Sequence, residues 1–131
     1  MISAAVQIFS DPLLYQKAFH AADVELLPTA RGEFSARMTQ IRLNKIWMQR
    51  ADEGLPRVLL GTVSSTRAIF GFLTDAGQSP TYHCGTRVSS DVLIVNNSDV
   101  MHRRTDGASR WGSLSLARED LRSASKTLCG R

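Results

Sequence analysis

The residues most able to do chemistry in this sequence are three histidines and two cysteines. A metal site needs three or four converging ligands, but His20, His83 and His102 occur in no HxH, HExxH or HxxE pattern. Cys84 follows His83 directly, and neighbouring strand residues point to opposite faces, so this adjacency alone makes no Cys–His pair. We therefore expect no metal ion and no cofactor, and ordinary hydrogen bonds for His83 and His102 near the rim of the fold.

Motifs of covalent catalysis and of phosphate binding are also missing from the sequence. The segment Trp111-Gly112-Ser113-Leu114-Ser115 lacks the leading glycine and the strand-to-helix context of a G-x-S-x-G nucleophile elbow. Gly54, Gly61 and Gly71 are isolated, whereas a phosphate-binding loop needs clustered glycines. These observations favour a binding domain over an enzyme.

The composition is typical of one ordinary globular domain. The chain has 131 residues, of which 43% are hydrophobic and 21% are charged, so one real core is possible. The net charge of +4 comes from scattered arginines, densest at Arg103, Arg104 and Arg110, and not from the basic stripe that indicates nucleic-acid binding. We expect a single domain over residues 1–131.

No segment of the sequence is typical of a membrane protein or of a secreted one. The longest apolar run, residues 68–73, is far shorter than the roughly 18 residues of a membrane span. The N-terminal segment lacks the basic region of a secretory signal, and Cys84 and Cys129 are expected to be free thiols. We expect a cytoplasmic protein with no membrane partner.

Hydrophobic periodicity predicts a short helix, a series of short strands and a final helix. The first helix is expected at residues 11–22, with Ser10 or Asp11 as N-cap and Pro12 in its first turn. The strands are expected at residues 24–28, 33–43, 46–50, 57–63, 68–74, 91–97, 101–105 and 109–116, with a weak hairpin at 81–90. The final helix is expected at residues 117–129, where Leu121 and Leu128 share one face.

Turn signals and one irregular strand complete this prediction. The alternation in residues 33–43 slips by one position, which predicts a bulge or sharp bend near Gln40. Asp106-Gly107 is a strong hairpin signal, and Ser98-Asp99 is a further expected turn. Short strands at regular spacing indicate a mostly β fold, a small β-barrel or sandwich with a short N-terminal helix and a C-terminal helix.

Several short blocks, taken in order, resemble a known family. The blocks are RGEF at 31–34, LNKIWMQR at 43–50, LPRVLL at 55–60, FLTDAGQ at 72–78, HRRTDG at 102–107 and RWGSLSLAREDL at 110–121. Together they resemble the N-terminal half of bacterial AraC-type transcription regulators, in particular a group with a cupin-like barrel. The resemblance implies an effector-binding and dimerisation domain. No segment looks like a recognition helix, so DNA binding is expected only through an additional helix-turn-helix domain absent from this chain.

The cupin motifs are degenerate in this sequence. Enzymatic cupins carry a histidine-rich first motif, but residues 31–62 contain no histidine. In the second motif, G-x5-P-x-G-x2-H, Asp91, Asn97 and Asp99 replace the glycine, proline and glycine, and only His102 remains. The resemblance therefore implies that the metal site of cupin enzymes has been lost.

The leading hypothesis is a metal-free, non-catalytic sensor domain in which a small-molecule effector binds one conformation better and biases dimer or domain docking. Trp47, His83, His102 and Trp111 are the candidate pocket-lining residues, although the two tryptophans can instead fill the core. Leu121 and Leu128 are candidates for a dimer or docking surface, although plain packing of this helix onto the barrel also explains a narrow apolar stripe.

Two alternatives from other classes stay open. A small cupin enzyme could use a non-standard metal site at His83 and His102. The chain could also be a stand-alone protein-interaction domain that forms mixed dimers with a full-length regulator.

Overall fold

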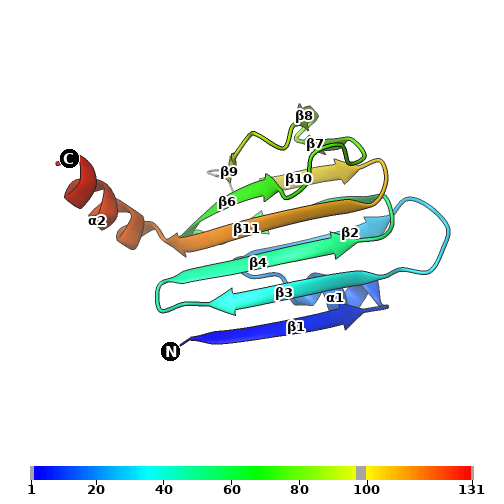
Figure 1. Ribbon diagram of the computed structural model, residues 1–131, viewed down its shortest axis with the longest axis horizontal. Coiled ribbons are helices and arrows are strands. Elements are labelled where there is room, and N and C mark those ends of the chain that lie inside the picture. The colour runs from blue at the N-terminus through cyan, green and yellow to red at the C-terminus, as the bar shows by residue number, and fades with distance from the viewer. Residues whose placement is uncertain (1, 97–99, 131) are drawn as a thin grey trace.

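The computed structural model describes residues 2–96 and 100–130 and consists of two antiparallel β-sheets that face one another (Figure 1). Alternating apolar residues of both sheets meet between them and form one core, which includes Leu59, Met38 and Trp111. The predicted mostly β fold is confirmed, and its form is that of a sandwich.

The first sheet, sheet A, has six strands in the order β1-β3-β4-β11-β6-β9. Their bounds are β1 Ser3–Phe9, β3 Ala36–Arg42, β4 Ile46–Glu53, β11 Ser109–Ala117, β6 Arg67–Leu73 and β9 Ile94–Asn96. The second sheet, sheet B, has five strands in the order β2-β5-β10-β7-β8. Their bounds are β2 Ala22–Pro28, β5 Arg57–Val63, β10 Val100–Thr105, β7 Thr81–His83 and β8 Thr86–Val88. The sequence did not predict β1, and it made β4 too short and β9 too long.

The first helix, α1, spans Pro12–Lys17 and is shorter than the predicted 11–22. Asp11 is its N-cap, as predicted, and accepts a hydrogen bond of 2.9 Å from the backbone N–H of Leu13. The helix ends early because Ala21 has a left-handed φ of 62° and Ala22 already pairs with Val63 of β5. This short helix places Tyr15 in the core, where the side chain is completely buried.

The predicted bulge near Gln40 is wrong, because β3 pairs with β4 in an unbroken register from Ala36 to Arg42. The side chain of Gln40 stays on the inner face, where its amide donates to the carbonyl oxygen of Ala18. Ile41 lies on the outer face of sheet A, opposite Met48. The hydrophobic pattern of the sequence therefore shifts by one position although the strand register does not. The polar Gln40 has a hydrogen-bond partner on the inner face, and the apolar Ile41 lies on the outer face.

The turn at Asp106-Gly107 exists, but the strands that it joins are not a hairpin. β10 belongs to sheet B and β11 to sheet A, so the turn carries the chain from one sheet to the other. Gly107 packs closely against the β6–β7 loop, since a Cβ atom at this position would lie 2.9 Å from Cβ of Ser79. The glycine serves this close approach and not a two-residue hairpin. The expected turn at Ser98-Asp99 lies outside the described residues.

The final helix, α2, spans Arg118–Cys129 and extends away from the sheets (Figure 1). None of its residues is buried, and Leu121 and Leu128 are 38% and 83% exposed. The alternative that this helix packs its apolar stripe onto the sheets is therefore wrong for the described chain. Neither α1 nor α2 has the length and apolar character needed to cross a lipid bilayer, which is the finding for the residues described.

Replacing Gly61 of β5 by alanine tests the tight contact between β5 and β2. A Cβ atom there would lie 2.8 Å from Cα of Val24, which is backbone and cannot move aside cheaply. We expect Gly61→Ala to lower the free energy of unfolding by about 1–3 kcal/mol, measured by urea denaturation. Thr62→Ala, on the exposed face of the same strand, is the control and should leave it almost unchanged. Equal stability of the two variants would contradict this packing.

Candidate functional site

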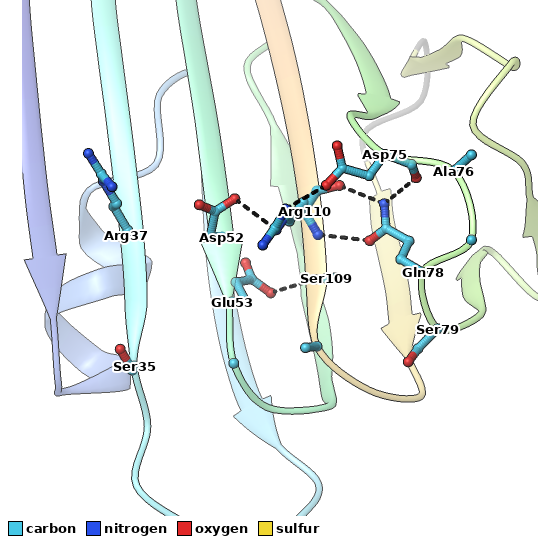
Figure 2. Close-up of a pocket in the computed structure, with 13 residues that line it drawn as sticks. Ser35, Arg37, Asp52, Glu53, Asp75, Ala76, Gln78, Ser79, Ser109 and Arg110 are labelled. Atoms are coloured by element: carbon cyan, nitrogen blue, oxygen red, sulfur yellow. Dashed lines mark hydrogen bonds and ion pairs between the residues drawn. The ribbon is translucent and has the colours of Figure 1, made fainter.

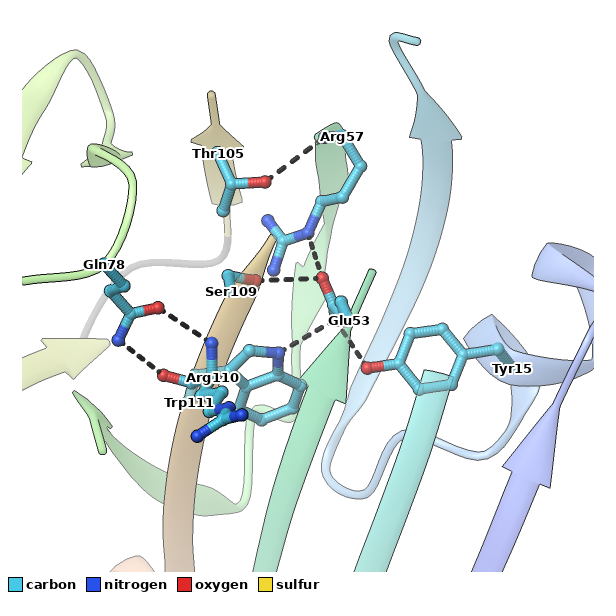
Figure 3. Close-up of polar contacts among 8 residues, drawn as sticks. All are labelled: Tyr15, Glu53, Arg57, Gln78, Thr105, Ser109, Arg110 and Trp111. Atoms are coloured by element: carbon cyan, nitrogen blue, oxygen red, sulfur yellow. Dashed lines mark hydrogen bonds and ion pairs between the residues drawn. The ribbon is translucent and has the colours of Figure 1, made fainter. Parts of the chain in front are cut away.

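A buried carboxylate, that of Glu53 at the end of β4, lies between the two sheets (Figure 3). It accepts hydrogen bonds from the Tyr15 hydroxyl, from Arg57 Nε at 2.7 Å and from Trp111 Nε1 at 2.8 Å. A weaker contact of 3.4 Å comes from the Ser109 hydroxyl. These donors come from α1, β5 and β11, so one carboxylate connects both sheets and the helix.

The surroundings of Glu53 decide its protonation. Burial alone would raise the pKa of this carboxyl, but the charge of Arg57 and hydrogen bonds from Arg57, Tyr15 and Trp111 lower it below its usual value. Burial, followed by the neighbouring Glu53 charge, raises the pKa of Tyr15 well above its ordinary value. Glu53 is therefore an anion and Tyr15 a neutral donor at neutral pH, and the cluster is arranged for holding charge rather than for moving protons.

Arg103 of β10 brings a second buried guanidinium into the same interior. Arg103 is 8% exposed. Its Nε donates a hydrogen bond of 3.3 Å to His83 Nδ1. Burial, with the nearby charge of Arg57, lowers the pKa of Arg103 to about 10, so the group remains a cation at pH 7. Among the described residues the buried interior thus holds two guanidinium groups and one carboxylate.

Two small cavities lie between the sheets, and Arg57, Arg103 and Trp111 line both of them. Their volumes are about 20 and 10 Å³. The larger one, called here the interior cavity, has room for a single water-sized group. The sandwich is therefore filled by side chains and is not a hollow barrel.

A much larger pocket, called here the end pocket, opens at the end of the sandwich where β4 and β11 meet the β6–β7 loop (Figure 2). Its volume is about 630 Å³. Arg110 lies in it and pairs with Asp75 at 2.9 Å and with Asp52 at 3.8 Å. The Gln78 amide donates to the Arg110 carbonyl at 3.0 Å and accepts from the Arg110 N–H at 2.8 Å. The buried Glu53 lies at the base of this pocket.

The structure separates the four residues predicted to line a pocket. Trp111 is buried and lines the interior cavity. His83 does not line this cavity but accepts a hydrogen bond from Arg103, which does. Trp47 lies at the opposite end of β4 from Glu53, with the guanidinium carbons of Arg67 and Arg42 lying 3.7 and 4.2 Å from its ring centroid.

The two histidines of the alternative metal site do not converge on one point. His83 pairs with Arg103 on the inner face of sheet B, and His102, the preceding residue of β10, is exposed on the other face. Within residues 2–96 and 100–130, no three His, Cys, Asp or Glu side chains are grouped closely enough to hold a metal ion.

The sequence reasoning missed Glu53, Arg57 and Arg103. Glu53 falls between the strands predicted at residues 46–50 and 57–63, and Arg103 belongs to the arginines described from the sequence as scattered. A signal was present for Arg103, because it falls at an inward position between Met101 and Thr105 of a period-2 strand. A charged residue at such a position indicates a buried charge.

Neither the family models nor the curated proteins include a match to this sequence. Among solved structures, the model is similar to the conserved protein of unknown function PA5104 from Pseudomonas aeruginosa PAO1, with a TM-score of 0.47 and 15% identity. The similarity covers 88% of this chain and 59% of that one, so this chain spans less than two-thirds of the neighbour's length.

Replacing Glu53 by glutamine tests its role as the shared acceptor. Arg57 and Arg103 would then both be buried without a counter-ion, so we expect Glu53→Gln to lose about 3–5 kcal/mol of unfolding free energy at pH 7. Because the folded pKa of Glu53 lies below its unfolded value, its contribution is present above about pH 4.3 and is lost as the pH falls through the folded pKa.

The difference between wild type and Glu53→Gln should therefore shrink between about pH 5 and pH 3, measured by urea denaturation across this range. Glu25→Gln, at an exposed position of β2, is the matched control. A Glu53→Gln protein as stable as wild type at pH 7 would show that the carboxylate is not needed.

Proposed function

We propose that this chain is a non-catalytic domain that binds a small polar effector, as its resemblance to the N-terminal domains of AraC-type regulators implies. The observation that carries this proposal is the end pocket. Its volume of about 630 Å³ falls within the range of roughly 300–1,000 Å³ typical of small-molecule sites. Several of the groups that line it are held by hydrogen bonds and ion pairs, namely Asp52, Asp75, Gln78 and Arg110.

The lining favours a ligand that carries both charges. The side chain of Arg37 lines the end pocket and makes no ion pair or hydrogen bond with the rest of the described chain, so its guanidinium is open to an anionic group. Asp52 of β4 and Asp75 of the β6–β7 loop supply carboxylates, both directed to Arg110. A zwitterion such as a free amino acid matches this arrangement, since guanidinium pairs well with carboxylate and aspartate with ammonium.

The end pocket also has a route to the rest of the molecule. Gln78 and Asp75 connect the β6–β7 loop to Arg110, which is the second residue of β11. The same strand leads directly into the exposed helix α2. A ligand that binds Asp75 or Arg110 more tightly in one position of this loop would shift the population of β11 and α2 arrangements.

Binding is tested with a panel of the twenty common L-amino acids, by thermal unfolding and then by isothermal titration calorimetry. At least one compound should bind, and Arg37→Met and Asp75→Asn should each weaken it about 10–100-fold, because each removes a charge-assisted hydrogen bond. Arg87→Met, an exposed arginine on β8, is the control and should bind normally. A bound compound whose affinity neither pocket variant changes would contradict the proposed site.

Dimerisation through α2 is the second part of the proposal. Leu121 and Leu128 are exposed, so their replacement should not affect the core. We expect the double variant Leu121→Asp/Leu128→Asp to elute as a monomer in light-scattering chromatography, where the wild type elutes as a dimer. The fold of the single chain should stay intact, because neither leucine belongs to the core. Arg122→Met, on the same helix, is the control. A wild-type chain that stays monomeric at high micromolar concentration, with and without a bound amino acid, would contradict this part.

A further inference from the structure

Each of the two sheets ends in two edge strands, and three of these four edges are protected against pairing with another strand. β9 and β8 have three residues each, and Arg87 adds a charge to β8. β2 carries Asp23 and Glu25, and the N–H of its Leu26 already donates to Gln16 Oε1 of α1 at 2.9 Å. Short strands, charges and covering elements are the features by which proteins prevent edge-to-edge pairing.

The remaining edge, β1, has none of these features. It has seven residues, none of them charged and none of them proline, and its register with β3 is unbroken. The side chains of Val6 and Ile8 are 54% and 77% exposed. Figure 1 shows β1 as the outermost strand of sheet A. In the described chain this edge is therefore an open template for another strand.

The pairing of β3 determines which backbone groups of β1 face the free side. The N–H of Leu43 donates to the carbonyl oxygen of Ile46 at 2.9 Å, so the odd-numbered residues of β3 bond to β4 and the even-numbered ones to β1. In the register of β1 with β3, these even-numbered residues lie opposite the odd-numbered residues of β1. The N–H and C=O groups of Ala4, Val6 and Ile8 therefore point away from sheet A and can bond to a further strand.

The sequence of β1 matches a second copy of itself in the antiparallel direction. The first half of the strand has small side chains and the second half has larger ones. A two-fold axis at Val6 makes the free-side residues the hydrogen-bonded ones, places each small side chain opposite a larger one and brings no like charges together. The resulting pairs are Val6 with Val6, Ala4 with Ile8, Ala5 with Gln7 and Ser3 with Phe9.

We propose that β1 pairs with β1 of a second copy of this chain, antiparallel about a two-fold axis at Val6, and joins the two copies of sheet A into one sheet. The pairing adds about six backbone hydrogen bonds, two from each of three residue pairs. Because it uses the free edge of both copies, association through β1 stops at the dimer. The interface is small, so we expect a Kd of about 100 µM. It depends neither on effector binding in the end pocket nor on dimerisation through α2.

The test uses the double variant Leu121→Asp/Leu128→Asp, in which any association through α2 is removed. Sedimentation equilibrium from about 10 µM to about 1 mM should show a monomer that becomes a dimer, with about four-fifths of the chains paired at the upper end. A mixture of isotope-labelled and unlabelled chains should then show an intermolecular NOE between the Hα atoms of Ala5 and Gln7. These two residues form a non-hydrogen-bonded pair across the axis, where the backbones lie closest.

Variants of Val6 connect the dimer to the edge. Val6→Lys should raise the Kd about 10-fold or more, because two lysines would lie directly opposite each other at the axis. Met48→Lys is the matched control, since it adds the same charge at an exposed position of β4, two strands from the edge, and should leave the Kd unchanged. Val6→Pro serves if Val6→Lys does not fold, because the N–H that proline removes is not bonded to β3.

Each outcome decides for or against the pairing. A dimer that shows the Ala5–Gln7 contact and that either Val6 variant weakens supports it. A chain that stays monomeric at about 1 mM would overturn it, and so would a dimer whose Kd neither Val6 variant changes. Association that continues beyond the dimer would contradict the two-fold arrangement, and a dimer without the Ala5–Gln7 contact would contradict the register. Since the α2 variant is the starting protein, a failure of dimerisation through α2 leaves this result unaffected.

Discussion

The carboxylate of Glu53 is the interaction on which the interior of this sandwich depends. It lies fully inside, where an ion without partners would be very costly, and it receives hydrogen bonds from α1, β5 and β11. These three elements are distant in sequence and belong to both sheets. The arrangement fixes how far the sheets can separate and which way the short helix turns, since moving any one donor would leave the charge less well satisfied.

The same arrangement leaves a mismatch of charge. Glu53 neutralises Arg57, and Arg103, two positions along the neighbouring strand β10, has only an imidazole as partner. A chain selected for stability alone would place an apolar residue at this inward position, as it does at Met101. Retaining arginine there lowers stability, and such a cost is common at functional sites, where stability and activity compete.

The sequence predicted the parts of the fold that depend on local patterns and failed where distant partners decide. The mostly β class, the Asp11 cap, β5, β6 and α2 follow from alternation, capping and helical spacing. The bulge at Gln40 and the hairpin at Asp106-Gly107 were wrong because Ala18 and the facing sheet determine those positions. Glu53 escaped notice for the same reason, since nothing local distinguishes it from a surface residue, whereas the position of Arg103 between the inward Met101 and Thr105 was a local signal. Only the strand register places Glu53 inside.

One strand joins the two candidate sites, and its alternation explains how. In β11, Ser109 and Trp111 point inward to Glu53 and the interior cavity, whereas Arg110 between them points outward into the end pocket. A shift of this strand along its own direction would move both sets of contacts together, because the three residues are consecutive in one strand. The strand then continues into α2, whose apolar residues are not covered. Arg110 in the end pocket is therefore connected to the exposed helix α2 by a single strand.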